Sequence, residues 1–385
     1  MKGEVMSHIY DHLGINPIVN AAGTYTVIGG SRMSETTLQK IAEAASQHVE
    51  IRELQRVVHE KIADMTQNEA AFICNGAASG LYLCTGAAIA KKKGKPAYYL
   101  DKQEIADSEI IIFAAHRNPY GQAISQYGAT VKEIGYPNII LPLTEQDLEM
   151  AINEKTVAIF FFAGDQGGWV AKGGLSFEAT AKVANAHGIP LVVDCAAQIP
   201  PISTLWDYTH NGADAIVVSG GKDLKGPQAS GLVLGKQDLL QYVQTTGFPN
   251  YGYGRMLKTG REEIVGLYWA LKEALETDHD ARDQWAEQQI RILADELATT
   301  ELFRVERTYP NEAGQPMARA SVRFPSDVTS EQVLKLLMQG HPRVMCNSEH
   351  DNQVFVNPMT LKEDEIYIVV NKFKEIEKLI ERGNK

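Results

Sequence analysis

Three short segments carry residue types that could do chemistry together. The segment Asn75–Gly80 consists of small residues and runs into an apolar, helix-like stretch, so backbone N–H groups at a helix start could approach an anion such as a phosphate. Asp194 ends an apolar run, where a carboxylate is costly to bury without a cationic partner or hydrogen-bond donors. Lys222 follows Ser219-Gly220-Gly221, and a lysine presented there is a candidate nucleophilic amine, because desolvation and a nearby cation favour the neutral form.

Each segment also has an ordinary interpretation. Small residues serve simple strand-to-helix turns, an Asp after a strand can cap a helix, and most lysines are solvated. Their order along the chain nevertheless predicts a site for pyridoxal 5'-phosphate. Gly76, Ala77 and Ala78 would bind the phosphate and Asp194 would keep the pyridine nitrogen protonated. Lys222, which follows the next strand-like run after Asp194, would hold the cofactor as a Schiff base.

A strand-rich region must position these segments. Its apolar runs do not alternate with polar residues, which is typical of strands buried on both faces, and helix-like stretches such as Ser176–His187 separate them. Strands that alternate with helices predict an α/β fold with a mainly parallel sheet of seven strands, whose carboxyl ends form the site. The predicted strands are Ala70–Cys74, Glu109–Ala115, Thr130–Ile134, Val157–Ala163, Pro190–Asp194, Ala215–Ser219 and Gly231–Leu234.

The sequence pattern changes after Arg261, where a long charged amphipathic helix precedes a smaller mixed segment. Strand-like Ala318–Phe324 and Val354–Asn357 and helix-like Ser330–Gln339 and Glu363–Glu381 predict a smaller C-terminal α/β domain. We therefore expect an N-terminal arm and helix over residues 1–66, a large cofactor-binding domain over 67–258 and a small domain over 259–385. The helical stretch 36–65 should pack near the small domain or a partner subunit.

Composition narrows the class of protein. The 385 residues contain 37 Lys and Arg against 48 Asp and Glu, a net charge of −11, which argues against a nucleic-acid partner. The polar start carries no apolar signal segment, and no later apolar run is long enough to cross a bilayer, so we expect no membrane partner and a cytoplasmic location. The four cysteines form no CxxC pair and predict buried free thiols and no metal site.

At this point the chain resembles a known family, the fold type I pyridoxal-phosphate enzymes, in the branch of L-seryl-tRNA selenium transferase. The resemblance runs from Asn16–Thr24 through Ser219–Ala229 and weakens in the small domain. It implies a fold type I transferase-like architecture, with Lys222 and not Lys225 as the Schiff-base lysine. Further implied cofactor contacts are Ser219 to the phosphate, Asp194 to the pyridinium and a His116 ring stacked on the cofactor.

Two positions depart from the family pattern. Gly221 stands where selenium transferases usually carry Asp. Gln198 lies four residues after Asp194, whereas desulfurase-like relatives place their Gln three residues after, so the resemblance does not assign Gln198 a cofactor contact. Selenium transfer itself is disfavoured, because selenium transferases bind tRNA, usually with an added N-terminal domain. Here the net charge is negative, and the resemblance to the cofactor domain starts close to residue 1.

A subgroup, the D-glucosaminate-6-phosphate ammonia-lyases, is similar along its whole length, including Asn20–Thr26, Gly29–Met33 and Ala163–Gly168. This resemblance implies elimination of water from a phosphorylated amino sugar acid, followed by release of ammonia and 2-keto-3-deoxy-6-phosphogluconate. Lys222 would remove the Cα proton of the substrate.

Such a substrate carries a carboxylate and a phosphate, which arginine and lysine recognise. The candidate cations are Arg32, Arg255, Lys258, Arg261 and Arg343, although a solvated or structural role is about as frequent for any single arginine. Arg343 falls in the small domain, where fold type I enzymes commonly place the arginine that binds carboxylate. The run Tyr251–Arg255 resembles the region by which a neighbouring subunit completes the site, so we expect a homo-oligomer, dimeric or larger.

Other functions stay open on the sequence alone. The chain could be a selenium transferase-like enzyme or another lyase or aminotransferase with the same cofactor. It could also be an RNA- or protein-binding relative that has lost catalysis, since fold does not fix function. The presence of both Lys222 and Asp194 argues against a decayed site.

Overall fold

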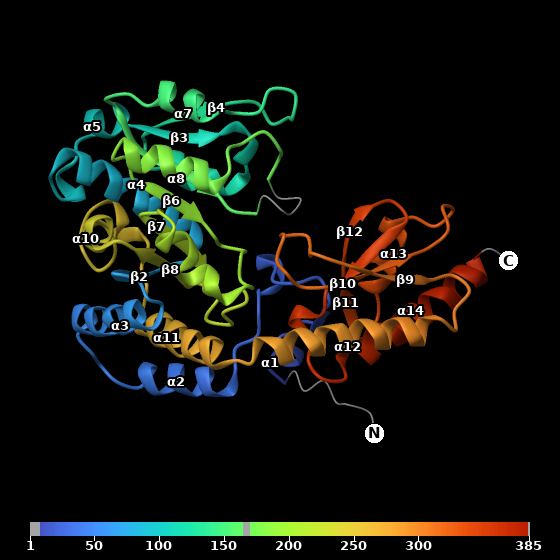
Figure 1. The fold of residues 1–385 in the computed structure, drawn as a ribbon. Coiled ribbons are helices and arrows are strands. Elements are labelled where there is room, and N and C mark those ends of the chain that lie inside the picture. Colours follow the sequence, from blue (N-terminus) through green and yellow to red (C-terminus); the bar gives the residue numbers. More distant parts are fainter. Residues whose placement is uncertain (1–7, 165–169, 384–385) are drawn as a thin grey trace. The chain divides into compact units, whose positions relative to one another are not determined.

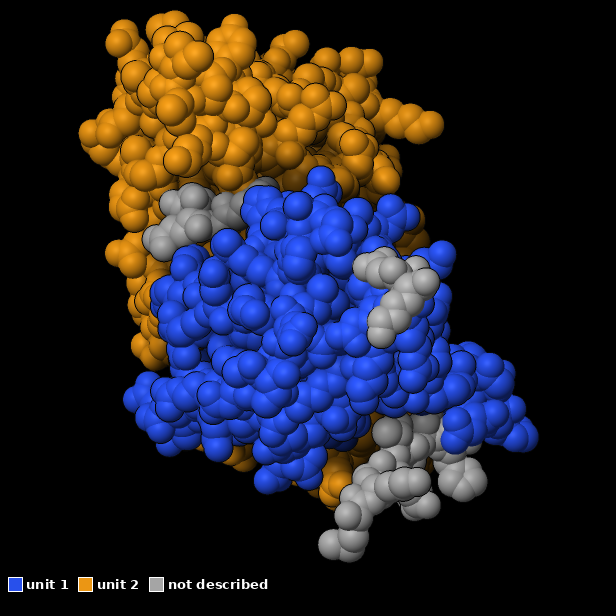
Figure 2. All heavy atoms as spheres, turned by 90° about the vertical axis from the view of Figure 1, so that its right-hand side faces the viewer, with its two compact units in different colours: residues 1–30, 278–311, 316–385 blue, residues 31–277, 312–315 orange. Residues whose placement is uncertain are grey.

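The computed structural model describes residues 8–164 and 170–383 and divides the chain into two compact units (Figure 2). Unit 2 comprises residues 31–277 and 312–315, and unit 1 comprises the described residues of 1–30, 278–311 and 316–385. This division differs from the predicted domain boundaries. The N-terminal segment that ends at Gly30 groups with the C-terminal segment, and the helices predicted before the sheet group with the sheet.

Unit 2 is built on a seven-stranded sheet with the order β2-β8-β7-β6-β5-β3-β4 (Figure 1). All neighbouring pairs are parallel except those of β8, which runs antiparallel to both β2 and β7. The predicted seven-stranded, mainly parallel sheet is confirmed. Its strands are β2 (Ala70–Cys74), β3 (Glu109–Phe113), β4 (Thr130–Ile134), β5 (Thr156–Phe162), β6 (Leu191–Asp194), β7 (Ala215–Ser219) and β8 (Gly231–Gly235).

Helices cover both faces of this sheet, which explains the continuous apolar strands. One face packs against α3 (Ile51–Met65), α7 (Glu145–Ala151), α8 (Phe177–Ala186) and α11 (Arg261–Glu276). The other packs against α4 (Ala77–Lys93) and α10 (Gln237–Thr246). Helix α8 begins as predicted, since the Ser176 side chain accepts a hydrogen bond from the Ala179 N–H. The remaining helices of the unit are α2 (Glu35–Ala45), α5 (Lys102–Ala106), α6 (Gln122–Ser125) and α9 (Asp207–His210).

The stretch 36–65 belongs to unit 2, where it packs against the sheet and against α11. Helix α11 lies within the range 259–385 that we predicted for the small domain, and packing of this stretch against a partner subunit stays a prediction. Helix α2 lies along α11. The Glu273 carboxylate of α11 accepts hydrogen bonds from the Ser34 and Thr37 hydroxyls at 2.6 and 3.0 Å. At the other end of α2, the Arg261 guanidinium donates to the Ala45 carbonyl at 2.9 Å. These bonds attach both ends of α2 to α11.

Unit 1 is the predicted smaller α/β domain with an added N-terminal strand. Its four-stranded antiparallel sheet has the order β12-β13-β10-β9, and a separate pair joins β1 in parallel with β11. The pairing of β1 with β11 explains why the N-terminal segment belongs to this unit. The strands are β1 (Ile18–Asn20), β9 (Arg304–Thr308), β10 (Arg319–Arg323), β11 (Arg343–Met345), β12 (Asn347–His350) and β13 (Gln353–Val356); the helices are α1 (His8–His12), α12 (His279–Leu297), α13 (Ser330–Leu337) and α14 (Glu365–Gly383).

The prediction of buried free thiols is confirmed, because all four cysteines are free and buried. Burial raises the pKa of the Cys74 and Cys346 thiols to about 12, so both stay protonated and unreactive at neutral pH. Among the described residues, no helix has the length and apolar character that a membrane span requires.

Candidate functional site

The predicted cofactor residues of unit 2 meet at the carboxyl ends of its parallel strands. Asp194 ends β6, where it pairs with Phe162 at the end of β5, and Ser219 ends β7. Gly231 at the start of β8 pairs with Ser219 on one side and with Cys74, the last residue of β2, on the other. The antiparallel strand β8 therefore places the loop after β2 next to the end of β7.

The loop after β2 has the backbone geometry of an anion site. Gly76 adopts φ 81°, which favours glycine, and precedes the first residue of α4. A Cβ on Gly231 would lie 2.5 Å from the Gly76 carbonyl carbon and 2.8 Å from the Ala77 nitrogen, so only glycine lets the start of α4 lie this close to β8. Among the described residues, no side chain caps this helix start. The first N–H groups of α4 are thus available to a phosphate.

Asp194 is a buried carboxyl group, as the apolar strand predicts. Burial raises its pKa, while the Ala196 N–H, which donates to Oδ1 at 2.9 Å, and the charge of Lys222 act in the opposite direction. These two favourable contacts do not restore what the carboxylate loses in hydration. A protonated ring nitrogen at this position would stabilise the charged carboxylate.

Lys222 is half-buried, whereas Lys225 is exposed and adopts φ 57°. Burial lowers the pKa of the Lys222 amine, and the neighbouring charge of Asp194 opposes the shift. A lower pKa increases the fraction of neutral amine, which is the nucleophilic form. These environments favour Lys222 over Lys225 as the lysine that binds the cofactor.

Close backbone packing explains why Gly221 replaces the Asp of the selenium transferases. A Cβ on Gly221 would lie 2.6 Å from the Gln228 Cα, and one on Gly220 would lie 2.1 Å from the Ser230 Oγ. The Gly221 carbonyl also accepts a hydrogen bond from the Ser31 N–H at 2.9 Å. A side chain at residue 221 would have to displace backbone of the same loop.

His116 follows β3 in a short 3-10 turn, Ala114–His116, and is buried. Its Nδ1 accepts a hydrogen bond from the Phe162 N–H at 3.2 Å, which assigns the ring proton to Nε2. Burial lowers the pKa of the ring to about 4, so the imidazole is neutral. The Phe161 ring packs edge-on against it at 4.6 Å. The site thus presents a neutral ring beside the ends of β3 and β5.

The Gln198 side chain forms a hydrogen bond with the backbone of the segment 312–315. Its Nε2 donates to the Ala313 carbonyl at 3.1 Å, and a Cβ on Gly164 would lie 3.1 Å from the same nitrogen. The amide therefore joins the turn after β6 to the segment 312–315. Of the predicted segment Ala163–Gly168, residues 165–168 lie outside the described residues.

The candidate cations of unit 2 fall into two groups. Arg32 follows Ser31, which is bonded to Gly221, and Lys258 offers its carbonyl to the Asn75 side chain at 3.2 Å, so both backbones lie beside the cofactor loops. Arg255 is exposed, with its guanidinium 5.0 Å from the centre of the Phe248 ring. Arg261 instead has a structural role, because it bonds Ala45 and lies 3.1 Å from the Glu262 carboxylate.

Arg343 lies in unit 1, on β11, where its guanidinium donates to the Asn16 carbonyl next to the partner strand β1. This contact gives Arg343 a structural role in joining the N-terminal segment to unit 1. The predicted carboxylate-binding role of Arg343 stays a prediction.

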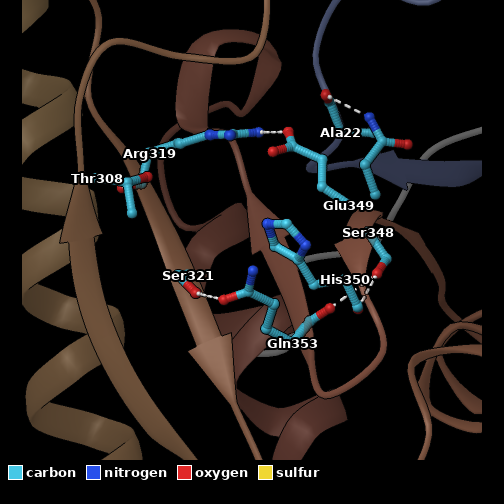
Figure 3. Close-up of polar contacts among 9 residues, drawn as sticks. Ala22, Thr308, Arg319, Ser321, Ser348, Glu349, His350 and Gln353 are labelled. Carbon is cyan, nitrogen blue, oxygen red and sulfur yellow. Dashed lines mark hydrogen bonds and ion pairs between the residues drawn. The ribbon is translucent and has the colours of Figure 1, made fainter. Parts of the chain in front are cut away.

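Sequence reasoning missed a buried arginine in the same unit, Arg319 on β10 (Figure 3). Its guanidinium forms an ion pair with Glu349 at 2.6 Å and lies 3.7 Å from the centre of the Phe355 ring. The available signal was a charged residue within the predicted strand Ala318–Phe324, four residues before Arg323. Around the pair, the Ser321 hydroxyl donates to Gln353 and the Asn347 amide to the Ala22 carbonyl.

The chain is similar over nearly its whole length to two characterised enzymes. It is 28% identical to the D-glucosaminate-6-phosphate ammonia lyase of Salmonella typhimurium, covering 96% of this chain and 98% of the relative. It is 25% identical to the 5'-C-glycyluridine monooxygenase-decarboxylase of a Streptomyces species, over 97% and 92%. An L-seryl-tRNA(Sec) selenium transferase of Geobacter metallireducens is 26% identical over 48% of this chain and 39% of its own length.

Solved structures agree with this similarity. A structure of D-glucosaminate-6-phosphate ammonia-lyase superposes with a TM-score of 0.81 and 26% identity, over 97% of this chain and 99% of the other. The ureidoglycine-glyoxylate aminotransferase of Bacillus subtilis shares the fold, with a TM-score of 0.59 at 13% identity over 96% and 94%. No protein-family model matches the sequence. The chain therefore has the fold type I architecture of pyridoxal-phosphate enzymes, and its predicted resemblance to the selenium transferase-like branch and to the D-glucosaminate-6-phosphate ammonia-lyases is confirmed.

Proposed function

We propose that this chain is a pyridoxal-phosphate-dependent ammonia-lyase that acts on D-glucosaminate 6-phosphate. Water would be eliminated first and taken up again when ammonia is released, so the net products would be 2-keto-3-deoxy-6-phosphogluconate and ammonia. The observation that carries the proposal is the similarity to an enzyme of this name across 96% of this chain and 98% of the relative. The half-buried Lys222 and the buried Asp194, at the carboxyl ends of β7 and β6, supply the matching chemistry.

The residues of unit 2 fit the cofactor group by group. The uncapped start of α4 at Gly76, Ala77 and Ala78 would hold the phosphate together with Ser219 at the end of β7, which β8 separates from β2. Asp194 would bind the pyridinium N–H, and the pairing would recover much of the free energy that burial takes from the carboxylate. His116 would pack against one face of the ring.

Bound pyridoxal phosphate supplies an electron sink for the substrate carbon that carries the amino group. The chain has to place a base next to that carbon. Lys222 suits this role, because burial lowers the pKa of its amine and a neutral Nζ can accept the Cα proton at neutral pH. The same ammonium can then donate a proton to the C3 hydroxyl group as it leaves.

The anionic ends of the substrate need cations near the cofactor loops. Arg32 and Lys258 have backbones beside the loops of Lys222 and Gly76, and Arg255 lies on the same exposed segment as Lys258. We propose these three as contacts of the carboxylate and the phosphate. Contacts to a phosphate distant from the reacting carbons would orient the Cα–H bond for removal.

We also propose that the protein is a homo-oligomer of the cytoplasm. Tyr98, Tyr251 and Met256 are exposed by 51%, 80% and 70%, and the Gly252 backbone lies against Tyr98, so apolar side chains gather on the segment next to Lys258. A face of this kind is typical of a subunit interface. Four free buried thiols suit a reducing compartment.

The direct test is turnover by the purified, cofactor-loaded protein. D-Glucosaminate 6-phosphate should yield ammonia and a 2-keto acid in equal amounts, and the Lys222→Ala variant should yield neither. Lys225→Ala, which removes the exposed lysine of the same loop, is the matched control and should keep most of the activity. Formation of a keto acid without ammonia would indicate a different reaction on the same cofactor.

A further inference from the structure

Residues 312–315 form a short segment of unit 2, although the chain on both sides of them belongs to unit 1. The segment lies between β9 and β10, and two of its residues, Ala313 and Gln315, are buried. Connections between strands normally run over the surface, where water satisfies their backbone groups. Contacts within unit 2 must therefore replace water around this segment.

Two glutamine amides attach the segment to the turn 195–199, which follows β6. The Gln198 Nε2 donates to the Ala313 carbonyl at 3.1 Å, and the Gln315 Nε2 donates to the Ile199 carbonyl. The turn and the segment thus each supply one amide donor and one carbonyl acceptor. A reciprocal pair of bonds of this kind fixes the position of the turn more narrowly than a single bond would.

The end of β5 leaves room for this pair of bonds. Gly164 has φ 118°, and a Cβ there would lie 3.1 Å from the Gln198 Nε2 and 3.7 Å from the Ala313 carbonyl oxygen. Ala163, the residue before it, donates its N–H to the Asp194 carbonyl at 3.0 Å. The two amide bonds therefore lie beside the strand ends that position Asp194.

The turn also carries a donor to the Asp194 carboxylate. The Ala196 N–H donates to the Asp194 Oδ1 at 2.9 Å. The Gln198 N–H donates to the Cys195 carbonyl at 3.1 Å, and the Gln198 carbonyl accepts the Thr204 hydroxyl at 2.8 Å. Because Gln198 is bonded to the start of the turn, fixing its side chain also fixes the backbone that presents the Ala196 N–H. A buried carboxylate depends on donors held in place in this way.

We propose that Gln198 and Gln315 are positioning residues for Asp194, which keep its carboxylate in the place and orientation that the pyridinium N–H requires. The inference rests on the proposed role of Asp194 toward the cofactor. A charge-assisted hydrogen bond weakens when its donor and acceptor are misaligned, so a loosened turn weakens the bond to the ring nitrogen. Neither glutamine has to touch the cofactor for this effect.

Dialysis of the loaded protein against a series of pyridoxal phosphate concentrations gives the Kd of the cofactor. Gln198→Ala and Gln315→Ala should each raise this Kd about fivefold, the equivalent of one neutral hydrogen bond. Gln289→Ala is the matched control and should leave the Kd unchanged. Gln289 and Gln315 are both 5% exposed, but the Gln289 amide donates to the Trp285 carbonyl of its own helix, α12.

The two variants together distinguish positioning from a direct contact. A higher Kd for Gln198→Ala, with the wild-type value for Gln315→Ala, would indicate that Gln198 itself binds the cofactor and would overturn the proposal. Wild-type values for both variants would overturn it as well.

A double-mutant cycle with Asp194→Asn separates positioning of Asp194 from a general structural role. The carboxamide carries no charge for the pyridinium, so Gln198→Ala in this background should change the Kd by less than about twofold, within the usual limits of additivity. A fivefold loss in both backgrounds would show that the glutamine only stabilises unit 2, and would overturn the proposal. A wild-type Kd for Asp194→Asn alone would instead reject the proposed role of Asp194, and the inference with it.

Discussion

Asp194 at the end of β6 and Lys222, just beyond the end of the adjacent parallel strand β7, interact electrostatically inside unit 2. Burial raises the pKa of the carboxyl group and lowers that of the amine, while the mutual charge opposes both shifts. Burial thus works against the charged form of each group, and the charge of the other group stabilises it. This pair is therefore suited to a cofactor that brings a cationic ring nitrogen to the acid and a carbonyl carbon to the amine.

The identity of the reactive lysine can be mapped chemically. The purified protein should be yellow, and borohydride should fix the cofactor covalently on Lys222, because its amine is half-buried with a lowered pKa. Peptide mass spectrometry reads the position directly. An adduct on Lys225 would reverse the assignment between the two lysines.

The neutral buried histidine predicts a pH dependence of stability. The pKa of His116 is about 4 in the folded state against 6.5 for an unperturbed histidine. Between these two pH values the unfolded chain therefore binds more protons than the folded protein. The contribution of the neutral His116 side chain to stability is complete above pH 6.5 and is lost as the pH falls toward 4. His116→Gln, which keeps an acceptor for the Phe162 N–H, should reduce the slope of unfolding free energy by up to about 1.4 kcal/mol per pH unit in this window.

The matched control for this experiment is His187→Gln at an exposed position. Urea unfolding at a series of pH values between 4 and 7 gives the slopes. Identical slopes for wild type and His116→Gln, with His187→Gln unchanged, would show that His116 does not titrate as its burial requires.

Two arginines of β10 should differ in their effect on stability. Arg319 is buried against Phe355 and paired with Glu349, whereas Arg323 is exposed and paired with Glu306 at 3.1 Å. Arg319→Ala should lower the free energy of unfolding by about 1–3 kcal/mol through lost packing and pairing. Arg323→Ala should cost less than about 1 kcal/mol, as for other exposed ion pairs. Equal urea midpoints for the two variants would contradict this interpretation of β10.

A selenium transferase should form a tight complex with seryl-tRNA. The net charge of −11 predicts that this chain forms no such complex. We expect weak binding of seryl-tRNA that disappears as the salt concentration rises from about 50 to 200 mM. Over this range, a protein that contacts several phosphates loses about 10³ to 10⁵ in affinity. Filter binding or fluorescence anisotropy across this salt range measures it. A nanomolar complex that resists salt would favour the selenium transferase alternative.

The sheet of unit 2 was predictable because its strands are buried on both faces. Continuous apolar runs such as the one in β5 leave a pattern that a single sequence reveals, and Ser176 marks the start of α8 by its capping chemistry. The site followed from the same pattern, since the ends of parallel strands must meet at one edge.

The membership of the N-terminal segment in unit 1 was not predictable in the same way. It depends on β1, a very short strand that pairs with β11 near the other end of the chain, and such a short strand has no periodic pattern. The roles of the arginines were equally hidden. Arg343 donates a hydrogen bond to the Asn16 carbonyl, and Arg261 donates one to the Ala45 carbonyl. Because every residue has a backbone carbonyl, such partners cannot be identified from residue types.

The most direct test of the proposed function compares D-glucosaminate 6-phosphate with unphosphorylated D-glucosaminate in steady-state assays of ammonia and 2-keto acid. If phosphate contacts orient the Cα–H bond, the unphosphorylated acid should lose kcat as well as affinity, with a total loss in kcat/KM equivalent to about 2–5 kcal/mol. Equal kcat/KM for the two acids, or faster turnover of serine or alanine than of either, would contradict the assignment of a sugar phosphate substrate.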